Sequence, residues 1–204
     1  MDSNDLKTIE FISNIIKEND LLVDVGANNG EYTDFFKNKL NSTGKIYCIE
    51  LSPATYNNLV NKFNGDENII VLNNAICDKN EPIMFYEGST SQTNNIIGHD
   101  MNFRPNKENG MVNGLRLDTL LNDVPIINLV KIDVEGAELL VLKGMEGVID
   151  KIKHIVLECH LDEDWEEIRD LILVKYKLSC HNILTNEEIT INSKRAYQCY
   201  CKKS

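Results

Sequence analysis

The stretch Leu21-Leu-Val-Asp-Val-Gly-Ala-Asn-Asn-Gly30 decides the fold of this chain. It predicts a buried parallel strand over residues 21–25, a tight turn that begins at Gly26, and a helix that opens at Gly30. A polar turn between an apolar strand and a helix N-terminus directs backbone N–H groups at a ligand above the strand, and glycine lets that ligand approach closely. The stretch therefore predicts a nucleotide-cofactor turn in an α/β fold.

The spacing of the turn separates two classes of cofactor. Dinucleotide-binding folds use Gly-x-Gly-x-x-Gly, whereas Asn28 here takes the place of the second glycine and the third glycine is also missing. This pattern disfavours a nicotinamide dinucleotide. Asp24 would be costly in an apolar strand without a partner, and we expect a cationic or hydroxyl-bearing group of the ligand to be that partner. A plain strand, turn and helix is the alternative at this point.

Length and charge limit the architecture and the partners. The 204 residues suit one α/β domain over 1–204. The net charge of −11 would repel nucleic acid and anionic membranes, so we expect neither as a partner and favour a small-molecule substrate. Within residues 1–20, helical spacing predicts an amphipathic helix from about Asn4 to Glu18 over one edge of the sheet. It resembles neither a signal peptide nor an anchor, so we expect a cytoplasmic monomer or homodimer.

The six cysteines are expected to be reduced thiols, because no secretory signal accompanies them. Cys159-His160 and Cys199-x-Cys201 raise the alternative of a zinc site. Neither has the C-x₂-C spacing usual for structural zinc. We therefore interpret the cysteines as small buried hydrophobic residues.

Polar residues follow the next two predicted strands. Glu50 ends the strand that starts at Lys45, 20 residues past Gly30, where α/β nucleotide folds place a carboxylate for the ribose hydroxyls. Asn74 and Ala75 follow the third strand and would suit the edge and the face of a flat heterocycle, with an Asn-rich turn as the alternative. Residues 89–114 form the least regular stretch, which we interpret as a substrate-side loop insertion.

A buried central strand is predicted from Asn128, and it ends in a cluster of acids. Lys131 and Asp133 share one face of it, and burying both costs several kcal/mol unless they are paired. The next strand ends in Glu158-Cys-His160. Because the carboxyl ends of parallel strands meet at one edge, we expect Asp133, Glu158 and His160 to lie together. Residues 161–174 then predict an acidic helix, and residues 177–201 predict closing strands that include an antiparallel hairpin.

These residues together resemble the FkbM family of S-adenosylmethionine-dependent methyltransferases, over about residues 21–160. Lys131-Ile-Asp-Val-Glu-Gly-Ala-Glu138 is the most specific part. The resemblance implies a three-layer Rossmann-like class I methyltransferase fold, an α/β fold with a mostly parallel sheet and an antiparallel C-terminal hairpin. It also implies S-adenosylmethionine as cofactor and O-methylation of a hydroxyl on a sugar or small metabolite. The cofactor-binding residues expected from the turn and the resemblance are Asp24, Gly26, Ala27, Asn28, Gly30, Tyr32, Thr33, Glu50, Leu51, Asn74, Ala75 and Asp133.

Methyl transfer to a hydroxyl needs orientation and a proton acceptor. The expected catalytic residues are Asp133, His160, Glu158 and Lys131, with His160 or Asp133 favoured as the base and Lys131 as a charge partner. A divalent ion held by Asp133, Glu135 and Glu158 is an alternative, although carboxylate clusters also form by pairing with lysine. A catalytically inactive cofactor-binding module and a nicotinamide-dependent oxidoreductase remain the rival functions.

Overall fold

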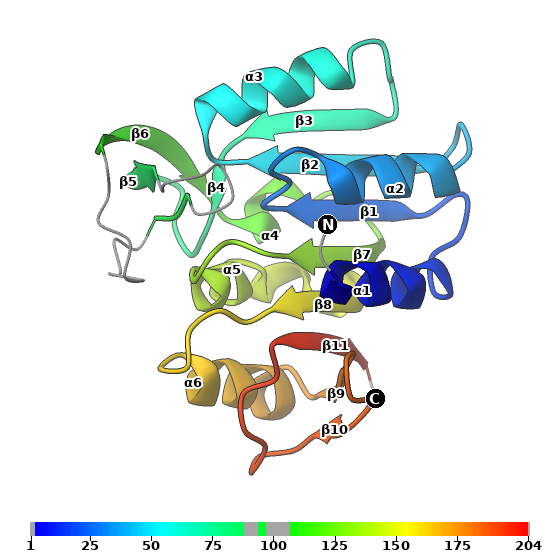
Figure 1. Ribbon diagram of the computed structural model, residues 1–204, viewed down its shortest axis with the longest axis vertical. Helices are drawn as coiled ribbons and strands as arrows, with labels where there is room; N and C mark the ends of the chain where they lie inside the picture. The colour runs from blue at the N-terminus through cyan, green and yellow to red at the C-terminus, as the bar shows by residue number, and fades with distance from the viewer. Residues whose placement is uncertain (1–2, 88–93, 97–106, 204) are drawn as a thin grey trace.

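A parallel sheet extended by antiparallel strands forms the middle layer of the protein. The computed structural model describes residues 3–87, 94–96 and 107–203. Within them, the strands of the large sheet are β1 Leu21–Val25, β2 Lys45–Glu50, β3 Ile69–Asn73, β7 Ile127–Ile132, β8 Ile152–Glu158, β9 Leu178–Asn182, β10 Glu188–Ile189 and β11 Gln198–Lys203. They follow the order β10-β9-β11-β8-β7-β1-β2-β3 (Figure 1). β1, β2, β3, β7 and β8 are parallel, and β9, β10 and β11 pair antiparallel, as predicted.

Helices cover both faces of this sheet, which gives the three layers expected. One face carries α1 Ser3–Ser13, α2 Glu31–Lys39 and α3 Pro53–Lys62, and the other carries α4 Leu117–Leu120, α5 Glu138–Gly144, the 3₁₀ helix η2 Glu146–Lys151, α6 Trp165–Asp170 and the π-helix η3 Leu171–Lys175. Successive residues of a strand point to opposite faces. Leu22 therefore packs in a cluster with Phe36 of α2, whereas Val23 packs in a cluster with Leu142 of α5.

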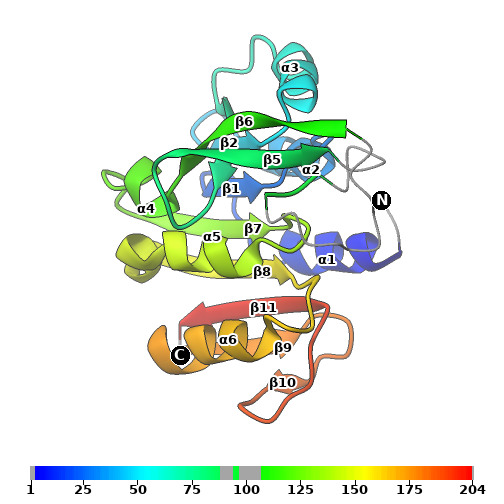
Figure 2. The same cartoon turned by 90° about the vertical axis from the view of Figure 1, so that its left-hand side faces the viewer.

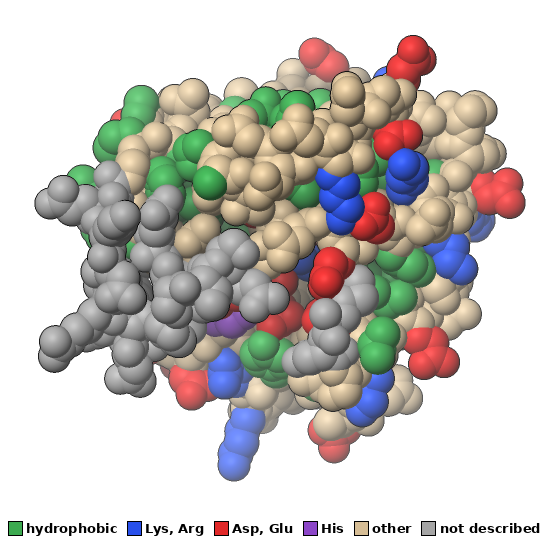
Figure 3. Space-filling model, turned by 45° about the horizontal axis from the view of Figure 1, so that its top comes forward, with side chains coloured by type: hydrophobic (Ala, Val, Ile, Leu, Met, Phe, Trp, Pro, Cys, Tyr) green, Lys and Arg blue, Asp and Glu red, His purple; other side chains and the backbone are tan. Residues whose placement is uncertain are grey.

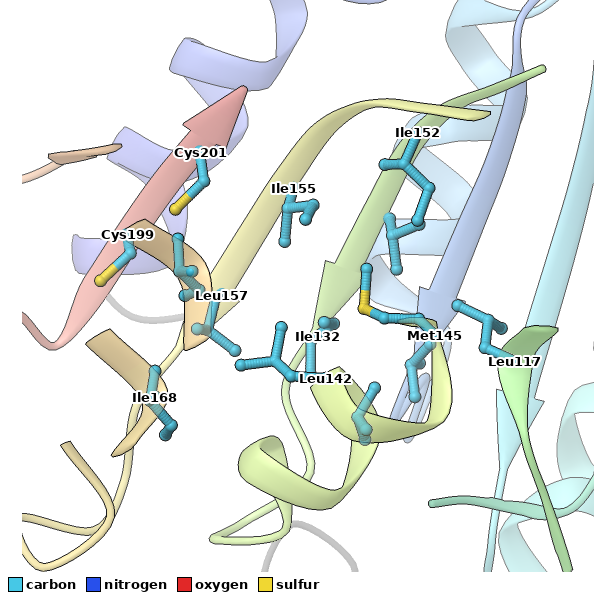
Figure 4. Close-up of a cluster of buried hydrophobic side chains, with 14 of the residues drawn as sticks. Leu117, Ile132, Leu142, Met145, Ile152, Ile155, Leu157, Ile168, Cys199 and Cys201 are labelled. Carbon is cyan, nitrogen blue, oxygen red and sulfur yellow. The ribbon is translucent and has the colours of Figure 1, made fainter. Parts of the chain in front are cut away.

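The second of these clusters fixes the central strands against the helices. Figure 4 shows Ile132, Ile155 and Leu157 on β7 and β8, with Leu142 and Ile168 on the helices beside them. Each of these side chains is at most 1% exposed. Full burial of such a side chain stabilises the fold by about 1.5–3 kcal/mol. The carboxyl ends of β7 and β8 are therefore held in a fixed relation to each other.

A small sheet lies beyond the carboxyl ends of the large one. It contains β4 Ala75–Ile76, β5 Pro82–Glu87 and β6 Lys107–Leu115, in the order β4-β6-β5. Figure 2 shows β5 and β6 as a long antiparallel pair. The prediction of an irregular loop up to Gly114 is wrong from residue 107 onward, because β6 pairs there. Gly110 made this segment resemble a loop in the sequence. In the structure the glycine leaves room for the Phe85 ring, because a Cβ on it would lie 2.4 Å from that ring. Residues 88–93 and 97–106 of the predicted loop lie outside the described residues.

The N-terminal helix is shorter than predicted and lies elsewhere. α1 ends at Ser13, where the Ser13 hydroxyl and the Asn14 amide both donate to the Glu10 carbonyl oxygen. Such local side-chain bonds compete with continuation of a helix. Ile12 belongs to one buried cluster with Leu22 and residues of four further strands, so the helix covers a face of the sheet instead of an edge.

Two of the six cysteines form a disulfide, so the prediction of reduced thiols is wrong for them. Cys180 and Cys201 lie directly opposite each other in the β9 and β11 register and are joined. Opposed residues of an antiparallel pair bring their Cβ atoms close enough for such a bond, and this register was not visible in the sequence. The other four cysteines are buried free thiols, as predicted: Cys48, Cys77, Cys159 and Cys199.

Among the described residues, none of the helices has the length and apolar character needed to cross a bilayer.

Candidate active site

A cavity of about 300 Å³ opens at the carboxyl ends of β1, β2, β7 and β8. The strand ends and their turns line it with Val25, Gly26, Ala27, Asn28, Asn29, Glu31, Tyr32, Ile49, Glu50, Leu51, Asn74, Ala75, Ile76, Lys131, Asp133, Val134, Glu135, Ala137 and Glu158. More distant parts of the chain add Asp5, Asn94, Ile96, Tyr197 and Gln198. In Figure 3, acidic side chains (red) and a histidine (purple) are visible together beside the grey residues.

Three backbone N–H groups of the turn after β1 already donate within the protein. Those of Gly26 and Ala27 donate to the Ile49 carbonyl at 3.1 and 3.0 Å, and that of Asn28 donates to the Glu50 carboxylate at 2.9 Å. A Cβ on Gly26 would lie 1.8 Å from the Asp133 carbonyl oxygen. The glycine therefore permits close contact between β1 and the residues after β7, which is a different role from the predicted approach of a ligand.

Asp24, Gly30 and Thr33 were expected to bind the cofactor, but they lie beneath the cavity and do not line it. Asp24 is fully buried. The Thr33 hydroxyl donates to its Oδ2 at 2.7 Å, and Lys131 Nζ lies 3.4 Å from its Oδ1. Buried neighbours within the protein therefore already pair with Asp24, and its pairing with a ligand group stays a prediction.

One end of the cavity is formed by Glu50 and the start of the small sheet. The Glu50 carboxylate is buried and accepts the N–H groups of Asn28 and Ser52 at 2.9 and 2.8 Å. Burial raises the pKa of Glu50, although these backbone hydrogen bonds act in the opposite direction. Ala75 is buried beside it, and the Asn74 amide donates to the Asn113 carbonyl at 3.1 Å. This end therefore presents one buried carboxylate, held by backbone hydrogen bonds.

Lys131 connects the two ends of the cavity. Its ammonium group is buried, 3.2 Å from Asp133 Oδ2 and 3.4 Å from the Gly26 carbonyl, and it lies 4.6 Å from the centre of the Tyr32 ring. Burial lowers the pKa of Lys131, but the charges of Asp133 and Asp24 outweigh that effect and raise it. The predicted pairing of Lys131 with Asp133 is confirmed, and Asp24 is a second partner.

The other end of the cavity is an acid cluster formed around His160. His160 itself does not line the cavity, and its side chain is 8% exposed. Nδ1 lies 2.6 Å from Glu138 Oε1, while Nε2 faces Glu158, Glu135 and Asp133 at 3.4, 3.6 and 3.8 Å. Burial lowers the pKa of His160, but the hydrogen bond to Glu138 and the surrounding carboxylates raise it to about 11.

The carboxylates around Nε2 differ in their hydrogen-bond partners and in their backbone conformation. Glu158 Oε2 accepts the Gln198 side-chain amide at 3.1 Å, and the Gln198 oxygen accepts the Thr8 hydroxyl. Glu135 has a positive φ of 54°, an uncommon conformation for a residue other than glycine. Burial and the neighbouring acids raise the pKa of Glu135 to about 7, against the lowering effect of His160.

Asp133, Glu158 and His160 each offer one ligand atom, and these three atoms lie within 4.8 Å of one another. The set differs from the predicted trio, in which Glu135 stood in place of His160.

Several residues of this site were missed by the sequence analysis. Glu138 belongs to the acid-rich block but lies 22 residues from the histidine that it holds. Asp5, Tyr197 and Gln198 come from the two ends of the described chain, and no local motif marks them. Only the covering of the sheet by α1 and the pairing of β11 with β8 bring them to the cavity.

Comparisons with known proteins agree with this geometry. The family profile of the Methyltransferase FkbM domain matches residues 24–182. Hexuronic acid methyltransferase AglP of Haloferax volcanii is 29% identical over 159 residues, which span 76% of this chain and 62% of AglP. The chain thus matches less than two thirds of the length of that relative.

Two solved structures share the fold. The FkbM methyltransferase of Methylobacillus flagellatus KT gives a TM-score of 0.55 at 18% identity, covering 96% of this chain and 47% of that one. Fibrillarin of Aeropyrum pernix, with natively bound S-adenosyl-L-methionine, gives 0.53 at 11% identity, covering 95% and 72%. The predicted class I methyltransferase fold is confirmed. Because the family profile matches most of its length, this chain belongs to the FkbM methyltransferase family.

Proposed function

We propose that the chain transfers a methyl group from S-adenosylmethionine to a hydroxyl of a sugar or small metabolite. One observation supports this above all. A single cavity has Glu50 and Ala75 at one end and the acids after β7 and β8 at the other. The first end suits a nucleoside, and the second suits a hydroxylated acceptor that must lose a proton.

The cofactor end fits S-adenosylmethionine. Asn28 Oδ1 is a buried oxygen without a hydrogen-bond partner among the described residues, and Asn28 lines the cavity. A ligand donor would satisfy it. The residues proposed to hold the cofactor are Gly26, Ala27, Asn28, Tyr32, Glu50, Leu51, Asn74, Ala75 and Asp133. When bound, the cofactor supplies an electrophilic methyl group, and the protein supplies position.

At the acceptor end, Glu135 is the carboxylate best placed to take the hydroxyl proton. It lines the cavity with 25% of its side chain exposed, and it pairs with His160 at 3.6 Å. Asp133, the base favoured from the sequence, already pairs through its Oδ2 with Lys131 at 3.2 Å. His160 lies behind these carboxylates and does not line the cavity. We propose that Lys131 and His160 position these acids by their charge.

The acceptor class follows from the family and from the cavity. AglP is a hexuronic acid methyltransferase, and a sugar hydroxyl is the acceptor that we propose here. The side chains of Asp133, Glu135 and Glu158 can all accept hydrogen bonds from a polyol. As part of the same proposal, the protein acts in the cytoplasm on a small acceptor and not on nucleic acid, which the net charge of −11 disfavours.

Calorimetric titration and a methyl-transfer screen test this proposal. S-adenosylhomocysteine should bind with one site per chain, and NAD should not bind. Labelled methyl groups should then appear on hydroxylated sugars, with uronic acids included in the screen. Binding of NAD in place of S-adenosylhomocysteine would favour the oxidoreductase alternative. Cofactor binding without transfer to any acceptor would favour the inactive module.

Glu135→Gln tests the base. The variant should retain cofactor affinity and lose at least about a hundredfold in turnover, the lower bound for a positioned base. Glu166→Gln is the matched control, because its side chain is 84% exposed on α6. Unchanged turnover in the Glu135 variant would exclude that residue as the base.

A further inference from the structure

We propose that Asp133, Glu158 and His160 form a site for one divalent metal ion, with Glu138 holding the histidine. The ion's binding is independent of the proposed function, and only its catalytic role rests on that function. Three observations carry the proposal: the spacing of the three ligand atoms, the orientation of His160, and the charge of the cluster.

The spacing of the ligand atoms suits coordination of one ion. His160 Nε2 lies 3.4 Å from Glu158 Oε1 and 3.8 Å from Asp133 Oδ1. Around an ion with bonds of about 2.1 Å, neighbouring ligands stand about 3.0 Å apart and opposite ligands about 4.2 Å apart. Both of these separations from His160 fall between the two values, and all three ligand atoms lie within 4.8 Å of one another. Asp133 Oδ1 is the oxygen that does not face Lys131, which lies 3.2 Å from Oδ2.

His160 has the orientation of a metal ligand. Its side chain is more than nine-tenths buried. Nδ1 is 2.6 Å from the Glu138 carboxylate, which is itself fully buried and also accepts the Gly136 N–H at 2.9 Å. A carboxylate on one ring nitrogen, with the other nitrogen aimed at further ligands, is the arrangement that fixes metal-binding histidines. The contacts of Nε2, at 3.4 Å or more, are longer than charge-assisted hydrogen bonds of about 2.7–2.9 Å.

The cluster carries more negative than positive charge. Four carboxylates surround the imidazole, from Asp133, Glu135, Glu138 and Glu158, and Glu138 Oε2 is buried without a hydrogen-bond partner among the described residues. Lys131 is shared with Asp24. The Arg195 guanidinium donates hydrogen bonds to the main-chain carbonyls of Cys159 and His160 at 2.9 and 2.7 Å. This cation therefore binds the main chain after β8 and not the carboxylates of the cluster. A divalent ion would supply the missing positive charge.

The ligand set of one nitrogen and two carboxylate oxygens suits Mn²⁺ or a similar first-row ion. At the acceptor end of the cavity, such an ion would bind the oxygen of the acceptor hydroxyl and favour its loss of a proton. The O–H bond breaks, and the Glu135 carboxylate takes the proton. The oxygen keeps the electron pair and uses it to form a bond to the methyl carbon of S-adenosylmethionine. The bond from this carbon to sulfur breaks, its electron pair stays on the sulfur, and S-adenosylhomocysteine leaves.

Mn²⁺ titration of the full chain, after treatment with a chelator, tests the site. Calorimetry and the spin-resonance signal of free Mn²⁺ should both give one saturable site. In buffers of different ionisation enthalpy, binding should release close to one proton, because Nε2 must lose its proton to become a ligand. In the histidine ring spectrum, Mn²⁺ should broaden His160 first among the four histidines of the chain.

Matched variants separate this site from adventitious binding. Glu158→Gln should abolish saturable binding, Glu138→Gln should weaken it about 10- to 100-fold, and Glu166→Gln should leave it unchanged. S-adenosylhomocysteine titration serves as the fold control for each variant. The proposal is overturned if the wild-type chain shows no saturable site, or if Glu158→Gln binds Mn²⁺ as Glu166→Gln does. Mn²⁺ binding without cofactor binding would refute the proposed function alone, and the converse would refute the metal site alone.

Discussion

Removing the charge of Lys131 should strongly destabilise the fold, because it breaks a buried ion pair with Asp24. Lys131 is 5% exposed and Asp24 fully buried. Within the part of the chain that the structure describes, Lys131→Met would leave Asp24 with the Thr33 hydroxyl, at 2.7 Å, as its one remaining polar partner. Breaking a buried ion pair by removing one partner costs about 3–5 kcal/mol, against a total stability of about 5–15 kcal/mol for a domain.

A second substitution tests whether the uncompensated charge causes this loss. Asp24→Asn combined with Lys131→Met removes both charges from the buried site, while the Thr33 hydroxyl can still donate to the amide oxygen. The double variant should recover about 1–3 kcal/mol of the stability lost in the single variant, the usual range for coupled neighbours. Lys203→Met is the surface control, because its partner Asp150 is 93% exposed, and it should change stability by less than about 0.5 kcal/mol.

Urea unfolding measures these free energies through the fluorescence of Trp165, the single tryptophan, which is buried in the core. Each variant should show an unchanged slope and a shifted midpoint. The reasoning fails if Lys131→Met loses less than about 1 kcal/mol. It also fails if Asp24→Asn adds its own cost to that of Lys131→Met without any recovery.

Three further predictions concern the cavity and the sheet. Glu50→Ala should weaken S-adenosylhomocysteine binding about 10- to 100-fold in calorimetry, the cost of a hydrogen bond to a charged group; unchanged affinity would refute the proposed ribose contact. Gly26→Ala should lower the free energy of unfolding in urea by roughly 2–6 kcal/mol, because its Cβ would collide with the Asp133 carbonyl and its φ is +78°. The control Gly65→Ala has φ +86° and open space around it, so it should lower that free energy by only about 1–2 kcal/mol. Burial lowers the pKa of His154, so at a pH just below the ordinary histidine pKa the unfolded chain binds more protons than the folded one. Stability should therefore fall as the pH falls from about 7.5 to about 5.5. His154→Gln should show a smaller fall in thermal midpoint over that range, and an equal fall would contradict the assignment of this pH dependence to His154.

Much of the fold was predictable because its signals are local. The apolar run over residues 21–25 and the glycine after it specify β1 and its turn wherever the rest of the chain goes. Pro53 marks the start of α3 because proline is suited to the first helical position. The carboxyl ends of β2, β7 and β8 carry Glu50, Asp133 and Glu158 in the sequence itself. Parallel pairing alone then brings these acids to one edge of the sheet.

Pairings between distant residues were decided only by the tertiary structure. That Lys131 neutralises Asp24 depends on the register of β1 against β7, which places these two residues side by side. That Glu138 holds His160 depends on how α5 packs beside the end of β8, and the Cys180–Cys201 disulfide depends on the register of β9 against β11. Hydrophobic periodicity fixes which face of an element is buried, but it carries no information about the alignment of one strand along another. The strand ends and their chemistry were therefore determined by the sequence, whereas the partner of each buried charge was set by packing and register.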